Sequence, residues 1–442
     1  MVEMRFVIDA GTESRMAEYL STVGDILRNK RRRESFAMYA MGLMGDGERK
    51  SCEPIAARAC PDPRLVDAYH QRLTYFLGES VWSDHDVRRY SARYALAEMT
   101  KRDPVQAWII DDTGFLKQGA HSVGVQRQYT GSAGKIANCQ VGVSLSVSTR
   151  TEHVPIDFEL YLPRCWTEDS ARRIEAHIPD EVVFRTKPQL AMDMIRRAVA
   201  DGLPKGVVLA DSAYGDSSAF RRDIRELGLD YAVEVHSPTK VWRLRGSGRS
   251  YGEPMSVADV GHHLPTKRFH RVTWRQGTKG KLWSRFAMCR VLPVRDEAQD
   301  DGGEAVWLVL EWPPNEPAST KFFLATLPAT ITRKRLVRLI KERYRTERAY
   351  EDLKGELGLD HFEGRTFGGW HHHVTVALSC FAFIVAERVR RFSPQWRLQE
   401  DDNPFAGETG APLPRLLHHR PPGVRPDNRH VAAEMPALPS AQ

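Results

Sequence analysis

The sequence predicts an α/β fold in which a mixed sheet with flanking helices follows a helical N-terminal domain and is interrupted by a β-rich insertion. Two short apolar runs, 107–110 and 207–210, each indicate a buried strand that ends at an aspartate. Apolar residues recur at helical spacing before residue 101 and again from residue 332. Between these helical zones, in 237–329, Gly, Thr and aromatic residues alternate with charged ones, which is typical of strands.

Length and composition limit the possible functions only loosely. A chain of 442 residues suffices for two or three domains. Its 64 Lys and Arg exceed its 57 Asp and Glu, and the net charge of +7 is compatible with a polyanionic partner without establishing one. The six cysteines lack zinc-site spacing, and the longest apolar run, 374–386, is too short to cross a bilayer. We therefore expect a cytoplasmic protein with reduced thiols and no membrane contact.

The first domain, 1–101, is expected to be helical and to bind DNA. Helical spacing is clearest in one apolar stripe, which comprises Phe36, Tyr39, Ala40, Leu43 and Met44. A basic cluster precedes this stripe and comprises Arg28, Lys30, Arg31, Arg32 and Arg33. The cluster suits contacts to DNA phosphates, but a solvated helix face is an equally good interpretation.

The second region, 102–236, is expected to form the first part of a catalytic core. A strand that ends at Ile110 precedes a turn at Asp111, Asp112, Thr113 and Gly114. Later elements comprise strands at 136–149 and 154–162 paired antiparallel, a helix at 187–200, a strand ending at Asp211, a helix at 217–227 and a strand at 231–235. This order predicts a mixed sheet with helices packed on it.

The remaining regions are a β-rich insertion at 237–329, a second part of the core at 330–397 and a tail at 398–442. The insertion holds half of the ten tryptophans, which we expect to fill its core rather than to stack on DNA bases: Trp242, Trp274, Trp283, Trp307 and Trp312. The tail contains eight of the 26 prolines and is expected to be disordered.

A third carboxylate lies on the helix that Thr332 can cap and that runs to about residue 357. Leu336, Ile340 and Tyr344 mark its inward face, and Glu347 follows three residues later on that face. A glutamate at a core position needs a partner or a metal ion. The alternative is a surface helix whose charged residues form ion pairs. The two aspartates at strand ends favour an active site that includes Glu347 over this alternative.

Four segments in combination resemble the DDE transposases of bacterial insertion sequences, in the branch with a Tyr-Arg-Glu-Lys signature: WIIDDTGFLKQG, YTGSAGKIANCQVGVSLSV, VVLADSAYGD and RYRTERAYEDLKGELGLDHFEGRTFGGWHHH. The resemblance covers about residues 35–389 and implies an RNase H-like fold. Arg343, Glu347 and Lys354 match the signature at its spacing, whereas Ile340 stands in place of its tyrosine.

The resemblance implies that Asp111, Asp211 and Glu347 are the catalytic carboxylates and metal ligands. Asp112 is a rival to Asp111, because adjacent strand residues face opposite ways and only one can point into a site. We favour Asp111, because it directly follows the apolar run as the first aspartate does in the family.

The chemistry that the resemblance implies is cleavage and rejoining of DNA with two Mg²⁺ ions, for which Mn²⁺ is expected to substitute. Arg343 and Lys354 would bind DNA phosphates. The partners would be double-stranded DNA, namely the terminal inverted repeats and the target, and a second copy of the chain in a homodimer that synapses two ends. We expect it in the bacterial cytoplasm, associated with the nucleoid. The alternatives are a non-catalytic DNA-binding regulator and an RNase H-like nuclease without strand transfer.

Three consecutive histidines, His371 to His373, raise the possibility of a metal site. Consecutive helical residues point about 100° apart and cannot easily share one ion. Packing, or a helix start near DNA, is the favoured interpretation.

Overall fold

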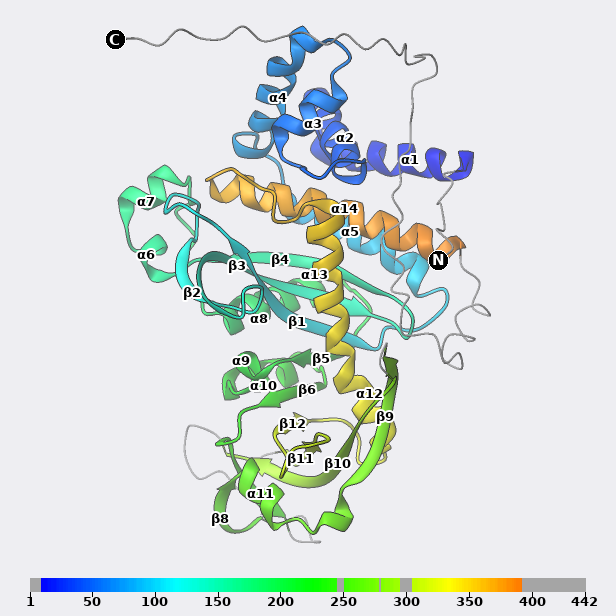
Figure 1. Ribbon diagram of the computed structural model, residues 1–442, viewed down its shortest axis with the longest axis vertical. Coiled ribbons are helices and arrows are strands. Elements are labelled where there is room, and N and C mark those ends of the chain that lie inside the picture. The colour runs from blue at the N-terminus through cyan, green and yellow to red at the C-terminus, as the bar shows by residue number, and fades with distance from the viewer. Residues whose placement is uncertain (1–8, 245–249, 278–279, 295–303, 392–442) are drawn as a thin grey trace, which may run out of the picture.

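The structure is a computed structural model that describes residues 9–244, 250–277, 280–294 and 304–391 (Figure 1). It confirms the expected fold class, since helices flank both faces of one large mixed sheet, as in an RNase H-like fold. In the described part of the chain the strand order is β2-β3-β1-β5-β6-β12-β11-β10-β7-β8, with β4 paired to β3 and β9 to β10. The tail expected at 398–442 lies outside the described residues.

Between residues 10 and 99 the chain is largely helical, and most of these helices lie on the side of α14 away from the sheet (Figure 1). The helices are α1 (Ala10–Leu27), α2 (Lys30–Met44), α3 (Cys52–Ala59), α4 (Val66–Gly78) and α5 (Asp84–Met99). The side chain of Asn29 caps α2 by accepting hydrogen bonds from the backbone N–H groups of Arg31 and Arg32. The basic cluster therefore lies at the start of this helix. The five apolar residues expected to form a stripe on this helix are all buried.

The core of the sheet combines antiparallel and parallel pairs. Its strands are β1 (Ala107–Leu116), β2 (Gln126–Thr130), β3 (Lys135–Ser148), β4 (His153–Tyr161), β5 (Val207–Ala210) and β6 (Tyr231–Val235). β3 runs antiparallel to β1, β2 and β4, whereas β5 lies parallel to both β1 and β6. The carboxyl ends of β1, β5 and β6 therefore meet at one edge region of the sheet.

The turn expected after Ile110 is wrong, because β1 continues to Leu116. The partner strand decides this: β3 pairs with β1 without interruption from Ala107↔Ser148 to Leu116↔Cys139. Gly114 fits inside the strand because any Cβ there would lie 1.9 Å from Thr130 Oγ1. Asp111 and Asp112 are thus consecutive strand residues and point to opposite faces.

Helices cover the two faces of this core. The side of Trp108 and Ile110 packs against α8 (Lys187–Ala200), as expected for 187–200, and α10 (Ser218–Glu226). The side of Ile109 packs against α12 (Arg333–Ile340). The short helices α6 (Arg164–Thr167), α7 (Ser170–Glu175) and α9 (Ser212–Gly215) complete this part of the chain.

The expected insertion contains mainly strands, and it extends the core sheet because β12 pairs antiparallel with β6. Its elements are β7 (Lys240–Leu244), β8 (Ser250–Ser256), α11 (Val257–His263), β9 (His270–Gly277), β10 (Gly280–Pro293), β11 (Val306–Trp312) and β12 (Lys321–Ala325). Its five tryptophans are half-buried rather than enclosed in a core. Four of them lie against a cation, as where the Arg271 guanidinium sits 3.9 Å from the Trp283 ring centre.

The helix expected from Thr332 begins with that residue as its cap, but it is not continuous. A 3₁₀ turn, Lys341–Arg343, separates α12 from α13 (Tyr344–Leu357), which crosses β1 in Figure 1. The last described helix, α14 (Phe367–Arg391), is long and apolar enough to span a membrane by length and composition alone. Its most apolar window is 94% buried, so α14 is a core helix of this fold.

Candidate active site at the carboxyl ends of β1 and β5

The two predicted aspartates lie at the same level on neighbouring parallel strands. β1 and β5 pair in the register Ala107↔Val207 to Ile109↔Leu209. Asp111 and Asp211 each lie two residues after the last pair of this register. Both aspartates have the parity of Ile109 and Leu209, whose side chains share one apolar cluster with α12. Asp211 also caps α9, because its Oδ1 accepts from the backbone N–H of Ala213 at 3.0 Å.

Asp111 is a buried carboxylate beside one guanidinium. Its side chain Oδ2 lies 3.0 Å from Arg343 Nη1. Burial raises the pKa of Asp111 to about 7; Arg343 opposes this rise and the neighbouring Asp211 adds to it. The site therefore carries more negative charge than Arg343 compensates, which is the condition under which carboxylates bind a divalent cation.

Asp112 is engaged on the other face of β1. Its Oδ2 forms an ion pair with Lys187 Nζ of α8 at 3.0 Å and accepts a hydrogen bond from the buried Tyr214 hydroxyl at 3.2 Å. These two groups supply the partners that a half-buried carboxylate needs. Of the two adjacent aspartates, Asp111 is the one on the face that α12 and α13 cover.

Arg343 is the residue on which the carboxylates converge. Burial disfavours its charged form, but Asp111, Asp211, Glu234 and Glu347 outweigh burial and hold the pKa of Arg343 above its ordinary value. Its buried Nη1 faces Asp111 Oδ2 in an ion pair whose angle is not that of a hydrogen bond. The other N–H groups of the guanidinium could donate to a phosphate oxygen of bound DNA.

Glu347 lies close enough to Arg343 to stabilise its charge, although the Glu347 side chain is exposed. It lies in the first turn of α13, four residues after Arg343 and three before Tyr350. The Tyr350 hydroxyl is 2.6 Å from Ser144 Oγ, and Ser144 is the β3 residue opposite Asp111. The residues on either side of Glu347 in this helical stripe therefore both reach the neighbourhood of Asp111. The three predicted carboxylates do not form a group with ligand atoms within 4.8 Å of one another in the described chain.

Lys354 connects α13 to the sheet through three hydrogen bonds. Its Nζ donates to Thr113 Oγ1 at 2.8 Å, to the Gly114 carbonyl at 2.7 Å and to Ser132 Oγ at 3.1 Å. All three acceptors belong to β1 or to the turn between β2 and β3. Lys354 thus lies at the border of the site with protein oxygens as its present partners. Ile340, in the place of the signature's tyrosine, packs in the apolar cluster under α12.

A sequence profile of the family described as DDE superfamily endonuclease matches residues 22–281. The chain belongs to this family. It is also 27% identical over 348 residues to the "Probable transposase for insertion sequence element IS701" of Microchaete diplosiphon, which covers 78% of this chain and 80% of that protein. Asp111 and Asp211 lie inside the matched profile, whereas Glu347 follows its end. DDE endonucleases act on DNA and use divalent metal ions.

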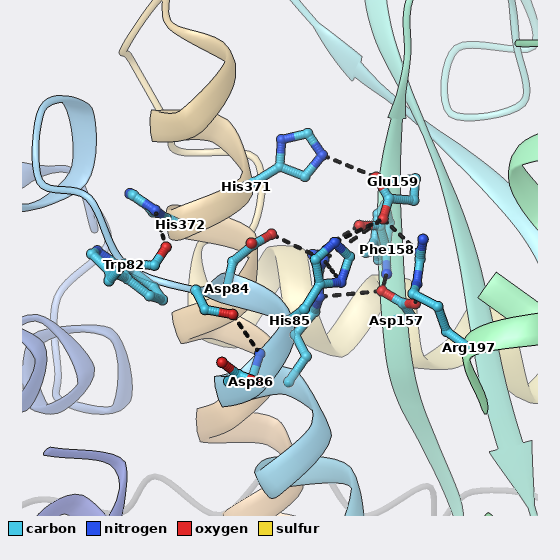
Figure 2. A network of polar contacts seen from close by, with 12 residues as sticks. Trp82, Asp84, His85, Asp86, Asp157, Phe158, Glu159, Arg197, His371 and His372 are labelled. Carbon is cyan, nitrogen blue, oxygen red and sulfur yellow. Dashed lines mark hydrogen bonds and ion pairs between the residues drawn. The ribbon is translucent and has the colours of Figure 1, made fainter. Parts of the chain in front are cut away.

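A second cluster in this DDE endonuclease has the spacing of a metal site but the contacts of an ion-pair network (Figure 2). His85, Asp157 and Glu159 form the one group of this kind among the described residues. Arg197 Nη2 lies 2.8 Å from Asp157 Oδ2 and 2.6 Å from Glu159 Oε1, and Arg88 Nε lies 3.2 Å from Asp157 Oδ1. Two guanidinium groups already occupy the carboxylates, so we assign the network to joining α5, β4 and α8.

The three consecutive histidines of the DDE endonuclease point in different directions, which confirms packing and makes a shared metal site wrong. His371 Nε2 faces Glu159 at 3.3 Å, whereas His372 lies against the Trp82 ring and bonds to the Leu77 carbonyl at 2.7 Å (Figure 2). His373 Nδ1 is 2.8 Å from the Tyr39 hydroxyl. Each ring therefore has its own partner in the core.

Sequence reasoning missed two residues near this site. Glu234 follows the register Ala210↔Val233 by one residue, so it lies level with Asp211 on β6. His236 directly follows the same strand, and its ring lies within hydrogen-bond distance of Ser212, the residue after Asp211. The signal for Glu234 was a charged residue inside an apolar strand, YAVEV. His236 had no comparable signal, because its partners lie 20 and 24 residues earlier.

Proposed function

We propose that this DDE endonuclease is the transposase of a bacterial insertion sequence, which cuts the ends of its element and joins them to target DNA. The observation that carries this proposal is the pair Asp111 and Asp211, level on adjacent parallel strands and close to the half-buried Arg343. The resemblance to the IS701 protein, whose printed name is a probable transposase, supports it independently.

The residues present fit a divalent cation. Asp111, Asp211 and Glu347 would hold two Mg²⁺ ions through oxygen atoms alone, the donor type that Mg²⁺ and Mn²⁺ prefer. Burial raises the pKa of Asp111 to about 7, and a bound cation would favour the charged form that burial disfavours. When bound, the two ions would activate the attacking oxygen and stabilise the leaving oxygen of the phosphodiester. Glu347 is exposed on the first turn of its helix, so its side chain is free to turn towards Asp111.

The cationic residues would position the DNA. Arg343 would offer the remaining N–H groups of its guanidinium to a phosphate oxygen, and its ion pair with Asp111 holds it beside the reacting group. We propose Lys354 as the second phosphate contact. A phosphate there would compete with three protein acceptors, so binding of DNA would loosen the attachment of α13 to β1.

The reaction would proceed in two steps at one site. Water would first hydrolyse the phosphodiester at the end of the element and free its 3′-hydroxyl. That hydroxyl would then attack a target phosphodiester, so that its oxygen joins the phosphorus while the bond to the target's own 3′-oxygen breaks, without a covalent bond to the protein. The partners would be the terminal inverted repeats, the target duplex and a second copy of the chain that holds the other end. The exposed basic residues at the start of α2 would contact DNA outside the site. We place this activity in the cytoplasm, on the nucleoid.

Two other functions remain as alternatives to be tested. A non-catalytic DNA-binding regulator would have no need of three carboxylates, yet all three are present. A nuclease with the same fold would cut without joining.

The test uses the full-length protein and labelled duplexes from the DNA on either side of its gene, with a supercoiled plasmid as target. We expect 3′-end release and joined products with Mg²⁺ or Mn²⁺, and neither with EDTA. Cutting without joining would identify a nuclease, and binding without cutting a regulator. Asp111→Asn and Asp112→Asn are a matched pair: only the first should reduce cleavage by about a hundredfold or more. The reverse result would transfer the metal site to Asp112.

A further inference from the structure

Three side chains form a hydrogen-bonded line directly beside Asp211. His236 Nε2 lies 3.2 Å from Ser212 Oγ, and His236 Nδ1 is hydrogen-bonded to Asp216 Oδ2. The other carboxylate oxygen of Asp216 accepts from the backbone N–H of His236 at 2.9 Å and from Thr239 Oγ1 at 3.2 Å. Asp216 therefore fixes both the backbone and the ring of His236.

The line of Ser212, His236 and Asp216 lies at the edge of the sheet where we propose that DNA binds. Ser212 directly follows Asp211 at the end of β5, and His236 directly follows the end of β6. These two strands are parallel, so both residues lie at their carboxyl ends, where open α/β sheets bind ligands. The hydrogen bond to Asp216 raises the pKa of His236, and the negative charges of Glu234 and Asp211 add to this rise.

The exposure of the line argues against a purely structural role. The side chains of His236 and Asp216 are 63% and 40% exposed. An ion pair so open to solvent contributes little to stability, in contrast to the less exposed network around Asp157 and Glu159 in Figure 2. Asp216 binds the Nδ1 atom of the ring. The Nε2 atom on the other side of the ring and the Ser212 hydroxyl face one another at the surface.

We propose that Ser212 and His236 bind a phosphate of the DNA strand next to the one that is cut, and that Asp216 is the positioning residue that orients the imidazole. The inference rests on the proposed function, because it requires DNA at this edge of the sheet. The Nε2–H of a protonated His236 and the hydroxyl of Ser212 can both donate to one phosphate oxygen. The order Ser, His, Asp also occurs in hydrolase triads, but the carboxylate of Asp211, one residue away, disfavours an alkoxide on Ser212.

The experiment measures binding of the full-length protein to a fluorescent 40-base-pair duplex from the flank of its gene, in EDTA, over a range of KCl concentrations. We expect His236→Ala to weaken binding about tenfold and to lower the slope of log Kd against log salt by about one, the value for one phosphate contact. Asp216→Asn should produce most of this loss although the histidine is present. Ser212→Ala should produce a smaller loss with a nearly unchanged slope, because a hydroxyl carries no charge.

His121→Ala is the matched control. His121 forms a similar exposed pair with Glu175, at 3.0 Å and with side chains 61% and 50% exposed, between the segment that joins β1 to β2 and helix α7. It should bind DNA like the wild type. Melting temperatures of all four variants check that each remains folded.

Duplexes with single neutral methylphosphonates locate the contact. At the contacted phosphate the wild type should lose about tenfold and His236→Ala nothing further. Additive losses at every position, or an unchanged salt slope in His236→Ala, would overturn the inference while leaving the proposed function intact. A wild-type protein that neither binds nor cuts the duplex would refute the proposed function, and the inference with it.

Discussion

Replacing Asp111 by asparagine should stabilise the metal-free protein at alkaline pH and at the same time abolish its response to Mg²⁺. The reason is the burial of an ionised carboxylate that Arg343 only partly compensates. Asparagine has nearly the same shape and no charge. The variant thus separates the cost of the acidic group from its proposed role as a metal ligand.

The magnitude follows from the pKa of Asp111, which rises from its ordinary 3.8 to about 7. Between these values the folded protein keeps a proton that the unfolded chain has released, so stability falls as pH rises and the cost is complete above pH 7. Three pKa units correspond to about 4 kcal/mol, a value that already includes the attraction of Arg343. It is an upper value for the variant because the asparagine amide is itself polar and must also be desolvated. We expect a net gain of about 1–2 kcal/mol at pH 8 that disappears near pH 4.

The assay is thermal unfolding of wild type and variant in EDTA at several pH values, followed by titration with MgCl₂. The advantage of the variant in melting temperature should grow by about 1–2 °C between pH 5 and pH 8. Mg²⁺ at ten times its Kd should stabilise the wild type by about 1.4 kcal/mol and leave the variant unchanged. A variant that is less stable than the wild type at pH 8, or equally responsive to Mg²⁺, would refute this reasoning.

Three further predictions concern single side chains. Asp211→Ala should abolish cleavage while end binding, measured by fluorescence anisotropy, stays largely intact; joint loss of both would count against a metal role. Glu347→Gln should reduce cleavage by about a hundredfold without lowering the melting temperature, because the side chain is exposed; unchanged cleavage would exclude Glu347 as a ligand. Arg197→Met should cost about 2–4 kcal/mol, because Asp157 and Glu159 lose their closest cation, and metal salts should not restore the melting temperature; restoration by Zn²⁺ or Mg²⁺ would reverse our assignment of that network.

Local patterns determined much of the framework. The apolar runs that end at Asp111 and Asp211, the helix at 187–200 and the cap at Thr332 follow from periodicity and capping chemistry, which act over a few residues. The resemblance carried by short motifs pointed to the superfamily that the sequence comparison then showed. The same local reasoning ended β1 at Ile110, because Asp, Thr and Gly favour turns when no partner strand is considered.

Only the tertiary structure decided how the charged groups share the site. Pairing with β3 kept Asp111 and Asp112 in one strand and thereby sent them to opposite faces, one to Arg343 and the other to Lys187. The break between α12 and α13 set the position of Arg343, and the sheet register brought Glu234 and His236 to the same edge. A one-dimensional pattern can give the direction of a side chain within its own element. The partner that a charge meets depends on the packing of elements far apart in the chain, and that partner decides whether the charge is paired, costly or available to bind DNA.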